Sequence, residues 1–285
     1  MIDFHTHPVM IRELVSEEAE LRRAVREVFG LLFPPQPLEV FLRELDEAGV
    51  ERAVLLPLDC TTAHGCRIVS NEQVAELASG NPRFIGFASV DPNLEDAPRA
   101  LERAVKGLGL RGLKLDPALQ RFRPDSRERA FPLYQACSQL GVPVMIHCGL
   151  SWAPRGRAGL ASPLFLEEAV QEFPALTFII PHFGWPWVGE AVMLALKHAN
   201  VYLDTSILYC GTPRQALHRV LAEQVGLNVL EQGLHDRLLF GSNYPRQDIR
   251  RSVRGLLDLP LSPSLREALL AGNAERLLQP QAGVS

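Results

Sequence analysis

The sequence of 285 residues predicts an α/β protein, a single closed (β/α)8 barrel with a C-terminal helix. Three observations predict this fold. Short apolar runs recur along the chain, amphipathic segments separate them, and the length is close to the roughly 250 residues of such a barrel. An open doubly wound sheet is the alternative, but no Gly-x-Gly-x-x-Gly pattern follows the first apolar run.

The apolar runs are the predicted strands. They are short and rich in Val, Ile and Leu, which is typical of parallel strands covered on both faces. In chain order they are Ile2–His7, Ala53–Leu58, Phe84–Val90, Gly112–Asp116, Pro143–His147, Thr177–His182, Val201–Asp204 and Arg237–Gly241. Since an amphipathic segment follows each run, we expect successive βαβ units and one parallel sheet.

The amphipathic segments are the predicted helices. In chain order they are Pro37–Ala48, Ser70–Ala78, Ala97–Val105, Arg127–Leu140, Pro163–Phe173, Val188–Lys197 and Pro213–Gln224. A terminal helix is expected over Pro263–Leu278, because Ser262 and Pro263 form a typical start and Gln279-Pro280 a typical stop. Neither a repeat nor a linker interrupts this order, so residues 1–285 are predicted to form one domain.

The segment Pro8–Gln36 is long for the first loop of a barrel, and a helix is expected within it over Glu17–Phe29. Two roles are open for this segment. It covers the mouth of the barrel, or it forms a contact in a homodimer.

Composition excludes several classes of protein. A net charge of −4 provides no basic stripe for a phosphate backbone, so no nucleic-acid partner is expected. The longest apolar stretches, such as Val142–Ile146, are far below the roughly 18 residues of a membrane span. The first residues lack the features of a signal peptide and the five cysteines are an odd number, so a reduced, cytoplasmic location is expected. Cys60, His64 and Cys66 suggest a zinc knuckle, but no second Cys/His pair follows and an ordinary loop is favoured.

Polar residues stand where several predicted strands end. His5 and His7 are two residues apart, so strand alternation points both side chains to one face while Phe4 faces the helices. His147 and His182 end two later runs. Because the functional residues of a barrel gather at the carboxyl ends of its strands, these side chains are expected at one mouth.

Asn243 follows the last strand, and alternation places it on the same face as Leu239. The same alternation groups His182 with Phe178 and Ile180. Three neutral imidazoles, an oxygen ligand and a water suit Zn²⁺, with Mn²⁺ or Fe²⁺ as alternatives. One divalent metal ion is therefore the predicted cofactor. It would lower the pKa of a bound water to near 7, and the remaining histidine would orient or deprotonate that water.

Motifs along nearly the whole chain resemble the amidohydrolase superfamily. The similarity is to its amidohydrolase-related (amidohydrolase 2) branch, which includes the aminocarboxymuconate-semialdehyde and resorcylate decarboxylases. The matching stretches are Ile2–His7, Pro82–Ala88, Gly112–Leu115, Met145–Gly149, Pro181–Gly184, Tyr202–Thr205, Gly241–Pro245 and Gly272–Leu277. The resemblance implies a metal-bearing barrel with His5, His7 and His147 as ligands, and His182 beside the metal-bound water. Members of this branch hydrolyse amides, esters or lactones, or remove CO₂ from unsaturated carboxylates.

Asn243 departs from the family pattern, which usually has Asp at this position. An amide oxygen can bind a metal, but Asn carries no charge and cannot accept a proton as a base. Three consequences are open. The metal binds more weakly, an acid such as Asp204 or Asp59 takes over proton transfer, or the parental chemistry is lost. Asp204 is the stronger of the two candidates because it also ends a strand, although a structural cap is an equal alternative.

Three further residues are candidates for binding a substrate. Lys114 is expected to point into the barrel, as a contact to a substrate carboxylate or in an ion pair with Asp116 or Asp3; a carbamylated bridging ligand ranks below both. In the polar loop after the fifth strand, Trp152 is a candidate for stacking on a planar substrate, and Arg155 for binding a carboxylate bidentately. Arg246 could also reach the rim.

These observations predict a cytoplasmic, metal-dependent enzyme acting on a small-molecule substrate. Hydrolysis of an amide, ester or lactone by metal-activated water is the leading hypothesis. A non-oxidative decarboxylase on the same scaffold is the first alternative. A non-catalytic ligand-binding barrel is the second, because of Asn243.

Overall fold

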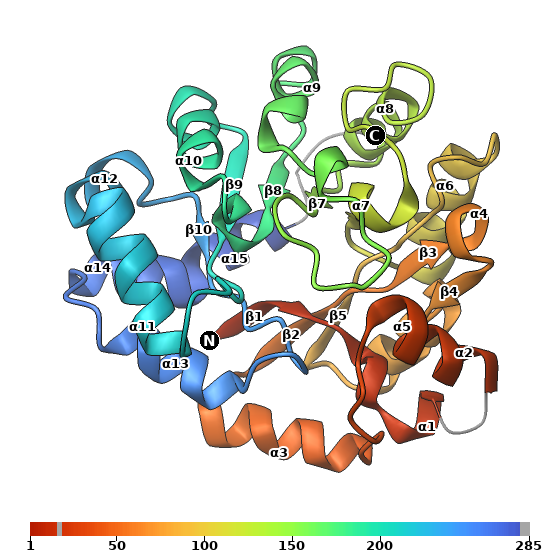
Figure 1. The fold of residues 1–285 in the computed structure, drawn as a ribbon, viewed down its shortest axis with the longest axis horizontal. Coiled ribbons are helices and arrows are strands. Elements are labelled where there is room, and N and C mark those ends of the chain that lie inside the picture. The colour runs from red at the N-terminus through yellow and green to blue at the C-terminus, as the bar shows by residue number, and fades with distance from the viewer. Residues whose placement is uncertain (16–18, 280–285) are drawn as a thin grey trace.

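The computed structural model describes residues 1–15 and 19–279. Eight parallel strands form the centre of the molecule, with helices around them (Figure 1). They are β1 (Ile2–Thr6), β2 (Arg52–Leu55), β5 (Phe84–Gly86), β6 (Leu113–Leu115), β7 (Val144–Ile146), β8 (Phe178–Ile180), β9 (Val201–Asp204) and β10 (Leu238–Leu239). Each lies within or overlaps a predicted strand, and most are shorter than predicted.

Two short interactions close these strands into a barrel. The pairings run β1-β2-β5 and β6-β7-β8-β9-β10. A bridge between Ala88 and Leu113 joins β5 to β6. On the other side, the Phe4 amide donates to the Phe240 carbonyl at 2.8 Å, which joins β1 to β10. The predicted (β/α)8 barrel is confirmed.

Helices cover the outer face of the barrel. The larger ones are α3 (Leu38–Ala48), α5 (Asn71–Gly80), α6 (Ala97–Leu108), α8 (Phe131–Leu140), α9 (Glu167–Glu172), α10 (Val188–Lys197), α11 (Pro213–Leu217), α12 (Leu227–Gly233) and α13 (Ile249–Leu257). A π-helical segment over His218–Gly226 joins α11 to α12. A capping box of Ser70 and Gln73 begins α5. Helices α12 and α13 have no counterpart among the predicted helices.

The terminal helix is confirmed, although it is not uniform. It consists of α14 (Pro263–Glu267), a π-helical turn over Ala268–Gly272, and α15 (Asn273–Leu278). Ala274 and Leu278 pack with the apolar side chains inside the barrel. Because Ile2, the first residue of β1, belongs to the same cluster, α15 covers the amino-terminal end. The carboxyl ends of the strands are left for chemistry.

Two predicted side-chain directions are wrong. In β1, Asp3 pairs with Ala53 but Thr6 pairs with Leu55, so the strand contains one extra residue, a β-bulge. Phe4 therefore packs inside the barrel, with its ring edge against Phe87 at 5.7 Å, and His5 turns inward as well.

The second error concerns β8. Phe178 and Ile180 pack outward with the surrounding helices, whereas His182 turns into the mouth. The strand ends before His182, whose φ of 61° lies in the left-handed region. This turn, and not strand alternation, sets the direction of the imidazole.

The region of Cys60, His64 and Cys66 is not the predicted ordinary loop. Strands β3 (Leu58–Cys60) and β4 (Cys66–Ile68) form an antiparallel hairpin around α4 (Thr61–His64). All five cysteines are free. Among the described residues, these three side chains do not meet the spacing of a metal-binding group.

The long first loop contains α1 (Arg12–Val15), α2 (Ala19–Ala24) and a π-helical turn over Val25–Phe29. The start of the helix predicted at Glu17 lies outside the described residues. The Phe29 ring lies 5.0 Å from the His7 ring, so this loop covers the mouth of the barrel. A homodimer contact stays a prediction.

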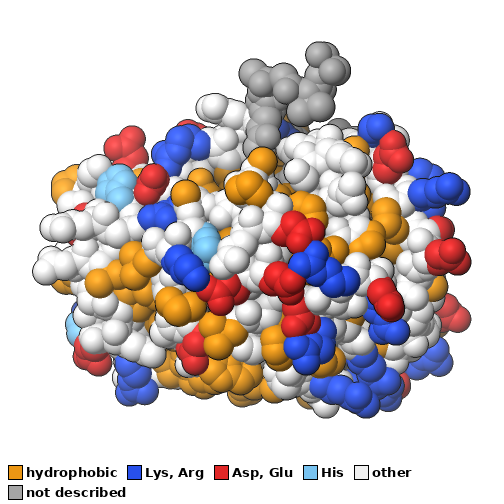
Figure 2. Space-filling model, turned by 90° about the horizontal axis from the view of Figure 1, so that it is seen from above, with side chains coloured by type: hydrophobic (Ala, Val, Ile, Leu, Met, Phe, Trp, Pro, Cys, Tyr) orange, Lys and Arg blue, Asp and Glu red, His pale blue; other side chains and the backbone are white. Residues whose placement is uncertain are grey.

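Charged side chains of both signs lie on the exterior of the protein. On the face in Figure 2, Lys and Arg side chains are interspersed with Asp and Glu, without a broad basic field. Within residues 1–15 and 19–279, the helices are all too short or too polar to cross a lipid bilayer.

Candidate active site

Four histidines and an asparagine surround a small cavity at the carboxyl ends of the strands. His5 and His7 extend from β1, His147 follows β7, His182 follows β8, and Asn243 follows β10. All five are buried. The cavity is about 30 Å³, which is space for about two water molecules.

Hydrogen bonds hold the two histidines of β1 in one tautomer. Nδ1 of His5 lies 2.9 Å from Oδ2 of Asp204, and Nδ1 of His7 lies 2.9 Å from the Leu56 carbonyl. Both partners can only accept, so each Nδ1 carries the hydrogen and each Nε2 presents a lone pair. The two Nε2 atoms are 3.2 Å apart. Burial holds the pKa of both imidazoles well below the usual value, so both are neutral near pH 7.

This donor set fits a divalent metal ion. Two lone pairs facing each other at 3.2 Å repel unless a cation lies between them, and two nitrogens on one tetrahedral zinc lie about 3.3 Å apart. Nε2 of His147 and Oδ1 of Asn243 are buried and have no hydrogen-bond partner among the described residues. Buried polar atoms are rarely left unsatisfied, so these atoms add two donors to the same cavity.

His182 is held in a similar way. Its Nδ1 lies 3.0 Å from the Ser206 carbonyl, so Nδ1 carries the hydrogen and Nε2 is an acceptor. Burial, and then the neighbouring His5 and His147, hold the pKa of this imidazole well below its usual value. A neutral histidine beside a metal cavity is suited to accept a proton.

Asp204 acts through its neighbours. One carboxylate oxygen accepts from His5 Nδ1, and the other accepts from the backbone amides of His182 and Ser206, each at 2.9 Å. Ligand atoms of His5, His182 and Asp204 lie within 4.8 Å of one another, so the three meet the spacing of a metal group. Since its oxygens already have donors, we assign Asp204 to positioning of His5 and His182 rather than to ligation.

Asp204→Asn is therefore expected to weaken metal binding about 10- to 100-fold, because the amide does not hold His5 in its ligating tautomer as a carboxylate does. Competition with a coloured chelator measures the affinity. Asp59→Asn is the matched control, because Asp59 bonds to Arg67 and Thr61 in the hairpin. Equal affinity in the Asp204 variant and the wild type would contradict the positioning role.

Lys114 points into the barrel as predicted, between the outward-facing Leu113 and Leu115. It is 1% exposed, and its Nζ has no hydrogen-bond partner among the described residues. Among the described residues Lys114 makes no direct ion pair with Asp116 or Asp3, although the charge of Asp116 attracts its ammonium group. Burial lowers the pKa of Lys114 to about 8, so most of the side chain is charged at pH 7.

A second cation lines the cavity, from a residue that the sequence only suggested. The Arg246 guanidinium lies 4.3 Å from the centre of the Phe29 ring and donates to the Phe29 carbonyl. Both contacts hold it at the mouth. Arg246 and Lys114 are the cationic side chains in the wall of this cavity.

The loop after β7 matches its predicted role only in part. Trp152 lines the cavity, is 59% exposed, and stacks on Tyr209 with ring centres 5.2 Å apart. Arg155 does not face the cavity. It is exposed and lines a separate hollow beside Cys66, so the structure argues against its predicted contact with a substrate. The loop turns Arg155 away from the cavity, and Arg246 is the arginine that lines it.

Sequence reasoning missed Tyr209 and Phe29. Tyr209 follows β9 in an irregular segment and has a φ of 49°. Its ring lies 5.8 Å from that of His182. Tyr209 belongs to no periodic pattern or motif. Phe29 ends the helix predicted over Glu17–Phe29, but periodicity does not show which side chain of that segment reaches the histidines.

Arg246→Ala is expected to raise KM for a carboxylate substrate about tenfold or more, because one charged hydrogen-bonding group is lost. Arg155→Ala removes the same group from a surface outside the cavity and should leave KM unchanged. Steady-state kinetics on both variants checks this difference. The reverse pattern would restore the role predicted for Arg155.

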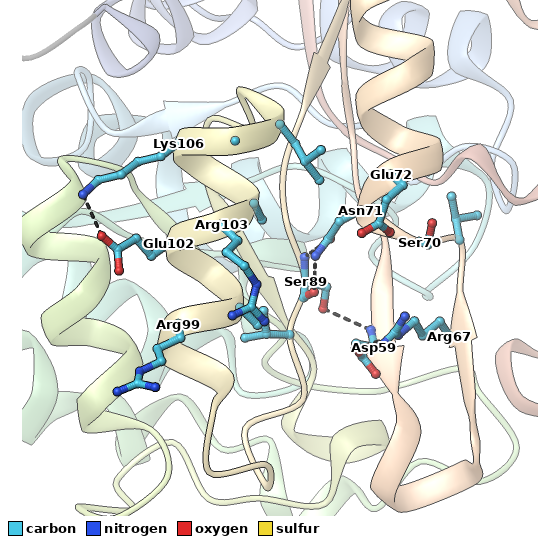
Figure 3. Close-up of a pocket in the computed structure, with 16 residues that line it drawn as sticks. Asp59, Arg67, Ser70, Asn71, Glu72, Ser89, Arg99, Glu102, Arg103 and Lys106 are labelled. Atoms are coloured by element: carbon cyan, nitrogen blue, oxygen red, sulfur yellow. Dashed lines mark hydrogen bonds and ion pairs between the residues drawn. The ribbon is translucent and has the colours of Figure 1, made fainter.

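A much larger hollow lies elsewhere, outside the barrel. It is about 870 Å³ and lies between α5, α6 and the β3–β4 hairpin (Figure 3). Several of its charged side chains already have partners, including Lys106 with Glu102 and Arg67 with Asp59. It contains no histidine or buried unpartnered group. The histidines and the buried unpartnered atoms therefore identify the smaller cavity as the candidate active site, although the hollow in Figure 3 is larger.

Comparison with known proteins gives a consistent picture. A model of the family described as Amidohydrolase matches residues 2–279. The gamma-resorcylate decarboxylase of a Polaromonas species is 26% identical over 299 residues, which cover 84% of this chain and 86% of the relative. The 2-keto-4-carboxy-3-hexenedioate hydratase of a Sphingobium species is 28% identical over 345 residues, with coverage of 97% and 95%. Both named relatives are enzymes.

Solved structures show the same fold. An uncharacterised TIM-barrel protein from Bordetella bronchiseptica is 28% identical with a TM-score of 0.78, over 98% of each chain. A dihydroxybenzoic acid decarboxylase from Polaromonas, solved with bound manganese and the inhibitor 2-nitroresorcinol, is 22% identical with a TM-score of 0.65. The alignment with it covers 97% of this chain and 96% of that one.

Proposed function

Since the chain belongs to the amidohydrolase family, we propose that it is a metal-dependent lyase whose substrate is a small unsaturated carboxylate. Decarboxylation is the leading reaction. The whole chain serves as one catalytic domain, and its partner is the small-molecule substrate.

The observation that carries this proposal is the buried ammonium group of Lys114, which has no hydrogen-bond partner among the described residues. A fully buried ammonium group without a hydrogen-bond partner is costly, and such a cost is typical of a site that awaits an anion. Arg246 supplies a planar, bidentate donor at the same mouth. Together they suit a carboxylate that approaches the histidines.

His5, His7, His147 and Asn243 would hold the metal, because their free donor atoms meet in the cavity. When bound, a divalent ion supplies Lewis-acid polarisation of a substrate oxygen. Zn²⁺ suits the imidazoles, and the manganese in the Polaromonas decarboxylase makes Mn²⁺ the second choice to test.

The protein side chains supply the remaining steps. Lys114 and Arg246 bind and orient the carboxylate. In decarboxylation the bond from carbon to the carboxylate breaks, CO₂ leaves, and one proton is added to the same carbon. The proton comes from solvent: the free Nε2 of His182 can accept it and pass it to that carbon, because the Ser206 carbonyl fixes the hydrogen on Nδ1. Asn243 cannot serve as the acid or the base, because its amide does not titrate.

Hydrolysis, the leading hypothesis from the sequence, is not favoured by the comparisons. The named relatives are a decarboxylase and a hydratase, which act on carboxylates without cleaving an amide, ester or lactone. Hydration of a double bond is the second candidate. The neutral His182 favours it, because such an imidazole can take a proton from water.

Incubation in D₂O with 2,6-dihydroxybenzoate, 5-carboxyvanillate and 2-keto-4-carboxy-3-hexenedioate tests the proposal, with protein loaded with Mn²⁺ or Zn²⁺. A decarboxylase releases CO₂ and leaves one deuterium on the carbon that lost it. A hydratase consumes the double bond without releasing CO₂. Hydrolysis of lactones or amides, without activity on any acid, would contradict the proposal.

Asn243→Asp is expected to raise metal affinity about tenfold, because a carboxylate adds a negative charge and a stronger oxygen donor. Turnover rises with it if Asn243 is a weakened form of the family site. Metal titration and steady-state rates are the measurements. Unchanged metal binding in the variant would show that Asn243 does not act as a ligand.

A further inference from the structure

The catalytic cavity is too small for the proposed substrates. At about 30 Å³ it holds little more than an ion and a water, whereas ligand sites are typically 300 to 1,000 Å³. A second hollow of about 590 Å³ adjoins it. Trp152, Tyr209 and Arg246 line both, so the two are neighbours across one wall.

We propose that this second hollow is a substrate subsite that takes the apolar, distal part of the carboxylate, with the stacked Trp152–Tyr209 pair as the gate between the two spaces. This inference rests on the proposed function and adds the place where the part of the acid beyond the reacting carbon binds.

Exposed apolar side chains give the hollow its chemistry. Leu32, Phe33 and Trp152, which line it, are 76%, 63% and 59% exposed. Exposure of large apolar groups is unremarkable when they are scattered, but a group of them in a hollow marks a binding site. Leu31 and Ile207 complete this apolar wall. A flat apolar group in the hollow would remove these side chains from water.

The charges around the hollow orient its ligand. Arg246 lies at the end shared with the catalytic cavity, where Phe29 holds its guanidinium. Asp248, at the rim, already accepts from the Arg251 amide at 2.8 Å as the cap of α13. Arg251 also lines the hollow, but Arg246 is the cation that it shares with the catalytic cavity, so the carboxylate is expected at Arg246 while the apolar part extends outward.

The gate is defined by ring geometry. The Trp152 and Tyr209 rings are stacked with an angle of 5° between their planes, and Tyr209 is also 5.8 Å from His182. Trp152 stands on the polar loop after β7, and Tyr209 on the segment after β9. Rotation of these two side chains joins the spaces without moving a strand.

Calorimetric titration of the full chain with benzoate and with biphenyl-4-carboxylate tests the subsite. The second ring is expected to improve affinity about tenfold or more, because it buries additional apolar surface. In Phe33→Ser this advantage should fall at least about threefold, while benzoate affinity stays constant. Leu196→Ser is the matched control, since Leu196 is 47% exposed on α10 and does not line the hollow.

Three outcomes separate the hypotheses. Equal affinity for both acids, or an advantage that Phe33→Ser and Leu32→Ser leave intact, overturns the subsite. A wild-type dimer in sedimentation that Phe33→Ser dissociates identifies the hollow as a contact between copies, and overturns it as well. Lys114→Met should weaken both acids equally. If it weakens neither while the biphenyl advantage persists, the carboxylate clamp of the proposed function fails and the subsite stands.

Discussion

Alanine in place of His5 is expected to lower kcat/KM at least about 1,000-fold and to reduce bound metal below a tenth of an equivalent. Lewis-acid stabilisation by a metal contributes several kcal/mol, and each 1.36 kcal/mol is a factor of ten in rate. The substitution removes one of two Nε2 donors that lie 3.2 Å apart. It also leaves Asp204 without the donor to its Oδ2.

Metal analysis and kinetics on the same preparation check this expectation. His235→Ala is the control, because His235 is far from the mouth and bonds to Ser264. Removal of the metal by a chelator should have the same effect in the wild type, with recovery on addition of Zn²⁺ or Mn²⁺, and should lower the melting temperature. Full metal content and activity in His5→Ala would contradict the role of His5 as a metal ligand. A wild type that binds no metal and shows no activity would leave the non-catalytic barrel as the better account.

The fold was predictable because it depends on periodicity. Eight apolar runs that alternate with amphipathic helices admit few arrangements, and the parallel barrel is the one that suits this length. The strand ends were less predictable. β10 pairs over two residues, Leu238 and Leu239, where the run spans five. Pairing is lost where the chain turns toward the site, and local sequence does not report where that occurs.

The histidines were predictable as a set because each ends an apolar run. Their directions were not, because the bulge in β1 and the left-handed turn at His182 arise from packing between distant segments. A bulge shifts every later side chain to the other face of a strand. Phe4 faces inward, and because of the bulge the next residue, His5, faces inward as well. The predicted direction was thus correct for His5 and wrong for Phe4.

The substrate-binding residues were the least predictable part. Lys114 lies in a strand, where alternation applies, and its direction was correct. Arg155 and Arg246 lie in loops, where direction depends on tertiary contacts such as the Phe29 ring under Arg246. The sequence shows that such cations exist but not which of them faces the site.

Lys114→Met is expected to stabilise the protein and to disable it. Methionine has a similar length and no charge, so it removes an unpartnered buried ammonium without leaving a large cavity. The pKa of Lys114 is about 8 instead of 10.5, a difference that corresponds to a penalty of about 3 kcal/mol for the charged form. The free energy of unfolding at pH 7 should rise by about this amount.

The dependence on pH identifies the cause. Burial lowers the pKa of this base, and below about pH 8 Lys114 is charged in both the folded and the unfolded chain, so the penalty is fully present. Between pH 8 and 10.5 the folded chain has released this proton while the unfolded chain still binds it, so stability rises with pH and the penalty disappears. The stability advantage of Lys114→Met should therefore shrink over this interval. Urea unfolding at pH 7 and pH 10 measures it.

The activity of Lys114→Met is expected to fall, whereas its stability rises. Removing the charge should lower kcat/KM for a carboxylate about 30- to 1,000-fold, since truncation of one partner of a buried charged pair costs 2 to 4 kcal/mol or more. For the wild type, KM should rise above about pH 8, where Lys114 loses its charge.

A variant that is less stable than the wild type would show that Lys114 has a structural partner. A stabilised variant with normal kinetics would show that the charge of Lys114 does not bind the substrate. Only gain of stability together with loss of carboxylate binding fits a cation held in the barrel for an anion.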